Sequence, residues 1–173
     1  MAQDYGIQLG NALIEEARRR LFVDSQPRIH KCLSLLTEEQ IWHRPNRETV
    51  SVGNLVLHLC GNVRQQIVST LGGAADNRIR SVEFSETGPI PTEQLLQEID
   101  KALDEVRETL DRLDPESLLQ MHPVQSYNES GVSILVHVIE HFSYHVGQIT
   151  WVVKSTQAVD VGYYAGADLD VTN

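Results

Sequence analysis

The chain has 173 residues, a length that fits one domain with a buried core, so we expect a single domain over residues 1–173. Its formal net charge of −10 argues against binding to the phosphate backbone of nucleic acids. Apolar residues make up 41% of the chain but form no run of about 20, so we expect no membrane partner. The N-terminal residues do not resemble a signal peptide, and we expect a cytoplasmic protein with free, buried thiols at Cys32 and Cys60.

The first predicted helix covers residues 7–36, where apolar side chains recur with helical spacing and Pro27 marks a possible break. A one-turn helix is expected at residues 38–41. The second long helix follows a cap at Thr49 or Ser51 and ends at about Leu71, before two glycines. Residues 72–91 then read as a long irregular connection, and connections of this length are usually functional or disordered.

The third predicted helix has Thr92 as its cap and ends at about Leu113, with interleaved acidic and basic residues typical of a solvent-exposed face. A connection at residues 114–130 contains a short turn and no predicted strand, and the fourth helix runs over residues 131–156. The core therefore covers about 7–157, and the tail at 158–173 is expected to lie on the surface or to be loose. This pattern predicts an all-α four-helix bundle with a long crossover between helices 2 and 3.

The last predicted helix carries three of the seven histidines, His137, His141 and His145, at intervals of four residues. Residues four apart on a helix lie about 6 Å apart along its axis on nearly the same face, so two such imidazoles can ligate one ion. Three cannot, because the outer two are twice as far apart. His141 and His145 fall within the apolar stripe, whereas His137 falls at its border. The buried pair needs polar partners, which are either a shared metal ion or hydrogen-bonding side chains.

His58 on the second predicted helix is the candidate for a third ligand. Its face of the helix carries uncharged polar residues, including Asn54, Asn62 and Gln65. Such a face is either a solvent-exposed edge or the lining of a polar cavity inside the bundle, which is where bundles hold metal ions.

These residues resemble the DinB-like (DinB/YfiT) superfamily of metal-binding four-helix bundle proteins. The typical pattern has one histidine on the second helix and HxxxHxGQ on the last, and this chain has LVLHLCGN at residues 55–62 and HFSYHVGQI at residues 141–149. Residues 77–84 are similar to the crossover of a poorly characterised branch. The resemblance covers most of residues 7–157. It implies His58, His141 and His145 as the ligands of a divalent metal ion, commonly zinc or nickel, in a protein that often forms a homodimer.

Characterised members of this superfamily are S-transferases and isomerases that use small thiols. We therefore expect a metal-dependent enzyme of the small-thiol S-transferase type, acting on a small molecule together with a low-molecular-weight thiol. Three imidazoles leave an open coordination position, where an ion can activate a water or deprotonate a thiol. The alternatives are a non-catalytic metal- or ligand-binding bundle with a stress-response role, a metal-dependent hydrolase, and a structural helical dimer whose histidines only pack.

Three polar side chains, Asn62, Gln65 and Gln148, are candidates to orient a ligand imidazole or a bound water. No catalytic residue is assigned, because Glu140 is predicted to point sideways from the histidine pair. Two arginines on the crossover, Arg78 and Arg80, either hold an anionic substrate or form ion pairs with Glu83 or Glu86.

Overall fold

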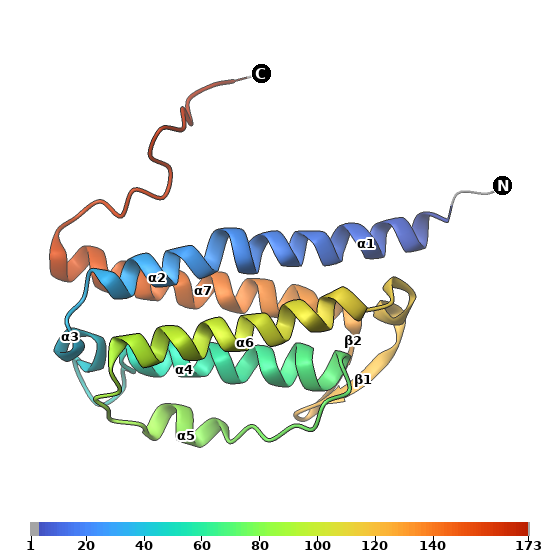
Figure 1. Cartoon of the computed structure of the whole chain (residues 1–173), viewed down its shortest axis with the longest axis horizontal. Helices are drawn as coiled ribbons and strands as arrows, with labels where there is room; N and C mark the ends of the chain where they lie inside the picture. The colour runs from blue at the N-terminus through green and yellow to red at the C-terminus, as the bar shows by residue number, and fades with distance from the viewer. Residues whose placement is uncertain (1–3, 173) are drawn as a thin grey trace.

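Four long helical segments pack side by side in the computed structural model, which describes residues 4–172 (Figure 1). This arrangement confirms the predicted all-α bundle. The first segment combines α1, a π-helical stretch η1 and α2, and the second combines α4 with the π-helical stretch η2. The bounds are α1 Tyr5–Arg18, η1 Arg19–Ser25, α2 Gln26–Ser34, α4 Val52–Val63, η2 Arg64–Leu71, α6 Thr92–Arg112 and α7 Gly131–Gln157.

Pro27 does not break the first segment. It stands in the first turn of α2, directly after the π-helical stretch η1. The preceding N–H, from Gln26, donates to the carbonyl of Leu21 five residues back, which is the π-helical pattern. The π-helical stretch therefore carries the helix past the proline.

The second segment begins at a reciprocal cap. The hydroxyl of Ser51 accepts a hydrogen bond from the backbone N–H of Asn54, and the Asn54 side chain accepts one from the backbone of Ser51. Of the two predicted caps, the structure therefore uses Ser51. The predicted cap at Thr92 was wrong by one position, because Pro91 takes the capping position and Thr92 is the first residue of α6.

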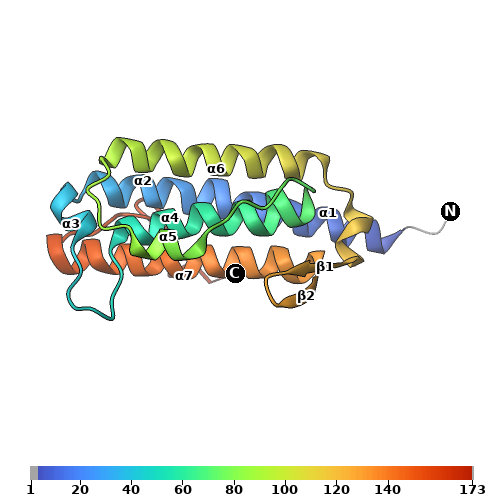
Figure 2. The same ribbon diagram turned by 90° about the horizontal axis from the view of Figure 1, so that it is seen from below.

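The connections contain more regular structure than the sequence indicated. A short helix α3 (Glu38–Trp42) lies where one was expected. Residues 72–91 include a further helix, α5 (Arg80–Ser85), which packs against α4 (Figure 2), so the prediction of an irregular crossover was only partly right.

The prediction of no strand was wrong at residues 121–130. After the short helix η3 (Pro115–Leu119), strands β1 (Met121–Val124) and β2 (Tyr127–Ser130) form an antiparallel hairpin. Its two-residue turn has Gln125 at a positive φ of 54°, a conformation common in such hairpins. The hairpin packs against η2 at one end of the bundle.

Apolar side chains from all four segments fill the core, and Leu21, Leu59, Leu103 and Phe142 are fully buried. Cys32 and Cys60 are free thiols buried in this core. Within residues 4–172, none of the helices is both long and apolar enough to cross a membrane. Beyond α7 the tail contacts the bundle through Val161, Tyr163 and Tyr164 and then leaves it (Figure 1).

Candidate metal centre

Three histidines from two neighbouring helices meet inside the bundle. His58 of α4 faces His141 and His145 of α7, and one ring nitrogen from each lies within 4.8 Å of the other two. His58 and His145 are buried, and His141 is half-buried. The α4 and α7 helices run in opposite directions (Figures 1 and 2). Asn54, His58 and Asn62 are all buried, so this face of α4 lies inside the bundle and is not a solvent-exposed edge.

Hydrogen bonds fix the orientation of two of the three rings. Nδ1 of His58 lies 2.8 Å from Oε2 of Glu83, and Nδ1 of His145 lies 2.6 Å from Oε1 of Gln148. Both oxygens are acceptors, so each Nδ1 carries the hydrogen. The lone pair of each ring is then on Nε2, the nitrogen left for a ligand. Nε2 of His58 lies 2.8 Å from Nε2 of His141.

Burial favours the neutral form of His141 and His145. Burial first, and then the nearby His145 and His58, lower the pKa of His141 to about 3. Burial also lowers the pKa of His145, against the opposing effect of its hydrogen bond to Gln148. Neutral imidazole is the form that binds a metal ion, so protons do not compete for the ring nitrogens of His141 and His145 near neutral pH.

The residues of this cluster fit a divalent metal ion. Two nitrogen ligands of a tetrahedral zinc ion lie about 3.4 Å apart, so only a small separation of His58 and His141 would admit one. Asn62, one turn from His58 on the same face of α4, is also buried. Its Oδ1 has no hydrogen-bond partner among the residues that the structure describes, as expected where a group outside the chain supplies the donor.

The two other predicted polar residues, Gln148 and Gln65, have different partners. Gln148 contacts His145 directly, as its position on the helix predicted. Gln65 makes no hydrogen bond to the three clustered histidines among the described residues and instead accepts one from Arg78 at 2.9 Å. His137 is exposed and stacks on His141, with ring centroids 5.2 Å apart, so it lies outside the cluster of three.

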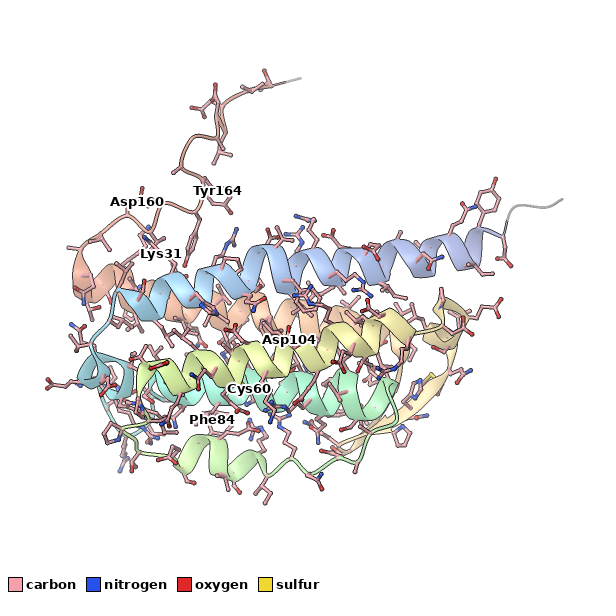
Figure 3. All side chains as sticks on the ribbon, viewed as in Figure 1. Lys31, Cys60, Phe84, Asp104, Asp160 and Tyr164 are labelled. Atoms are coloured by element: carbon pink, nitrogen blue, oxygen red, sulfur yellow. The ribbon has the colours of Figure 1, made fainter. Side chains whose placement is uncertain are left out.

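The two crossover arginines have separate environments. Arg78 forms the ion pair with Glu83 that was one of its predicted alternatives. Arg80 is exposed and lies over the ring of Phe84, 4.7 Å from the ring centroid. The Phe84 side chain lies between α5 and α4 (Figure 3), and its ring centroid is 4.7 Å from that of His58. Glu140 is exposed.

Sequence reasoning missed Glu83 as part of the site, because it considered this residue only as a partner for the arginines. The signal that could have found it was chemical: a ligand histidine usually donates its second ring N–H to a carboxylate or carbonyl. Burial alone would raise the pKa of Glu83, but hydrogen bonds from Arg78 and His58 outweigh it and hold that pKa below its ordinary value. The group beside His58 is therefore a carboxylate.

A cavity of about 730 Å³ adjoins the cluster between α7 and the loop before α4. Tyr144 and Gln148 line it and also contact His145, which is not itself a lining residue. The rest of the lining is mainly apolar and includes Val52, Leu55 and Trp151. Such a cavity has the size and character of small-molecule sites.

Comparisons with known proteins agree with this description. A crystal structure of a DinB-like protein from Bacillus cereus ATCC 10987 superposes with a TM-score of 0.60 and 18% sequence identity, over 79% of this chain and 88% of that chain. The likeness shows that the chain has the DinB-like fold, which confirms the resemblance at the level of the fold. No curated protein matches the sequence. Residues 8–163 match the family described as "Protein of unknown function (DUF1572)", and the chain belongs to this family.

Proposed function

We propose that this protein binds a divalent metal ion through His58, His141 and His145, and that the ion serves a reaction on a small molecule. The convergence of the three imidazoles carries the proposal. Buried ring nitrogens need a polar partner, and a shared ion would give one to all three rings at once. Two of them already have their second nitrogen held by Glu83 or Gln148.

Zinc and nickel are the ions proposed for this donor set. Imidazole nitrogens suit zinc, nickel and copper, whereas magnesium and calcium prefer oxygen ligands. Three protein ligands are typical of catalytic sites, because a fourth position remains for water or substrate.

The reaction proposed is the transfer of a small thiol to an electrophile. A divalent ion at this site would supply a Lewis acid that lowers the pKa of a bound thiol. In the transfer, the thiol proton passes to solvent, the sulfur bonds to the electrophilic carbon, and the leaving group departs with the bonding electron pair. Tyr144, Gln148 and Trp151 would bind the apolar part of the substrate in the adjoining cavity.

Two measurements test this proposal. Protein purified without a histidine tag should contain stoichiometric zinc or nickel by mass spectrometry. His141→Ala should lose the ion, and the matched control His137→Ala should retain it. The metal-loaded protein should conjugate a small thiol to monobromobimane or chlorodinitrobenzene faster than the metal-free protein does. A metal-free protein overturns the proposed site.

Metal binding without conjugation by any thiol in the panel would overturn the transferase reaction. Hydrolysis of test esters or amides in that experiment would favour the hydrolase, and inactivity with both would favour a non-catalytic binding bundle. The homodimer stays a prediction, which light scattering on the purified protein checks.

A further inference from the structure

The crossover between η2 and α6 places a carboxylate beside His58, one of the three clustered histidines. Glu83 of α5 contacts Nδ1 of His58, and the two side chains are only 10% and 5% exposed. Their bond joins residues 25 positions apart in the chain. No local sequence preference places them together, so the fold of the crossover does.

Arg78 fixes the carboxylate of Glu83 in position. Its Nε donates to Oε1 at 2.7 Å and one terminal nitrogen donates to Oε2 at 2.9 Å, in the two-point geometry that arginine and carboxylate groups favour. The arginine side chain is 4% exposed, and its other terminal nitrogen donates to Gln65 at 2.9 Å. Arg78 thus holds both oxygens of the carboxylate and shares Oε2 with His58.

This arrangement determines which nitrogen of His58 carries the hydrogen. Arg78 also approaches Nδ1, at 3.1 Å, but a guanidinium can only donate. The carboxylate of Glu83 can only accept, and it lies closer to Nδ1 at 2.8 Å. Nδ1 therefore donates to Glu83, and the lone pair of the imidazole is on Nε2.

Gly61 lies where the carboxylate of Glu83 approaches α4. A Cβ added to Gly61 would lie 2.0 Å from Oε1 of Glu83 and 3.0 Å from Nε of Arg78. The backbone of the crossover is fastened from the same helix, because the Asn54 amide donates to the carbonyls of Glu83 and Glu86. The α4 helix is thus shaped to receive this ion pair.

We propose that Glu83 is a positioning residue for His58: it holds the imidazole in the Nδ1–H form and aims Nε2 at the point where His141 and His145 converge. Arg78 and Gly61 support it by fixing and admitting the carboxylate. The crossover is then a functional part of the metal centre. The role of Glu83 in metal binding rests on the proposed function. The orientation that it gives the His58 ring applies to the metal-free protein as well.

The first experiment reads the ring directly. In metal-free protein labelled with ¹⁵N-histidine, the chemical shifts of His58 should show a protonated Nδ1 and an unprotonated Nε2. Glu83→Ala should change these shifts toward a mixture of the two neutral forms. The control is Asp100→Ala, which removes the carboxylate that contacts His30 elsewhere in the bundle and should leave the His58 signals unchanged. An unprotonated Nδ1 in the wild-type protein overturns the proposal.

The second experiment measures the affinity for zinc by competition with a chromophoric chelator. Glu83→Ala should weaken binding about 10- to 100-fold, the range found when such outer contacts are removed. Gly61→Ala should weaken it as well, since the added methyl group displaces the carboxylate without changing any charge. Glu83→Gln keeps an accepting oxygen and the side-chain shape, and should recover part of the loss. Asp100→Ala should bind zinc as the wild type does.

The outcomes separate this inference from the proposed function. A wild-type protein that binds no metal overturns the proposed function, while the ¹⁵N measurement still decides the position of the hydrogen. A wild-type protein that binds zinc no more tightly than a folded Glu83→Ala variant overturns the role of Glu83. Circular dichroism establishes folding, and if Glu83→Ala does not fold, Gly61→Ala and Glu83→Gln decide the same question.

Discussion

Two histidine–carboxylate pairs in this bundle have similar lengths and different surroundings. His30 of α2 lies 2.6 Å from Asp100 of α6, and its side chain is 39% exposed. His58 lies 2.8 Å from Glu83, and its side chain is 5% exposed. The shorter contact is therefore the one that water surrounds. Burial and the groups behind the carboxylate therefore distinguish the two pairs, and the length of the bond does not.

The difference in exposure sets how each pair responds when it is broken. Water can solvate Asp100 or His30 when its partner is removed, and exposed ion pairs typically contribute at most about 1 kcal/mol. Glu83 has little access to water and depends on Arg78 and His58. Removing one partner from a buried charge pair typically costs about 3–5 kcal/mol.

The largest expected effect comes from replacing the histidine of each pair. His58→Ala should reduce bound zinc or nickel to the background level, because it removes one of three ligands. His30→Ala should leave the metal content unchanged, because His30 is absent from the cluster. Elemental analysis of the two variants, purified side by side without tags, is the measurement. Equal metal content in both variants would show that His58 is no ligand.

The next effect concerns stability without metal. Arg78→Leu should lower the free energy of unfolding by about 3–5 kcal/mol, since it leaves the Glu83 carboxylate buried without its cation. Asp100→Ala should lower it by at most about 1 kcal/mol. Urea unfolding of both metal-free variants at neutral pH measures the difference. If the two variants lose similar amounts, burial does not distinguish the pairs.

A smaller effect is expected at His145, the second ring whose orientation a hydrogen bond fixes. Gln148 is a neutral acceptor for His145 and is itself exposed, whereas Glu83 is charged and buried. Gln148→Ala should therefore weaken zinc binding by about tenfold, the low end of the range for such contacts, because water can replace the lost acceptor. The same chelator competition measures it. A loss greater than that of Glu83→Ala would reverse the ranking of the two positioning contacts.

Local sequence pattern predicted the parts of the structure that depend on local geometry. The helical spacing of apolar residues predicted α6 and α7, and the interval of four residues between His141 and His145 implied that both face the same way. The structure brings these two rings together with His58. Their role as ligands stays a prediction.

The missed features depend on contacts between distant residues. Residues 121–130 have neither alternating apolar residues nor a typical turn pair, so nothing local predicted the hairpin. The position of Glu83 depends on how Asn54 and Arg44 bind the backbone carbonyls of the crossover. Such long-range hydrogen bonds leave no periodic signal in the sequence.

The smallest expected effect concerns Glu16, an exposed carboxylate that accepts hydrogen bonds from arginines as the buried Glu83 does. Hydrogen bonds from Arg19, and then from Arg20, lower the pKa of Glu16 from 4.5 to about 2. Because the pKa is lower in the folded state, the contribution of Glu16 to stability is present above pH 4.5 and is lost as the pH falls toward 2. A ¹³C-carboxyl titration by NMR should find the low midpoint, and Arg19→Ala should raise it. A wild-type midpoint near 4.5 would contradict this.

Glu16 and Glu83 thus share a lowered pKa with arginine donors as a cause, and differ in exposure. If the comparison holds, Glu16→Gln should change urea stability at neutral pH far less than Arg78→Leu does, because water replaces what the arginines supply at the surface. A large loss from Glu16→Gln would mean that the hydrogen bonds themselves, rather than burial, set the cost. Measuring both variants at low and high salt separates the two causes, since salt screens the exposed group much more than the buried one.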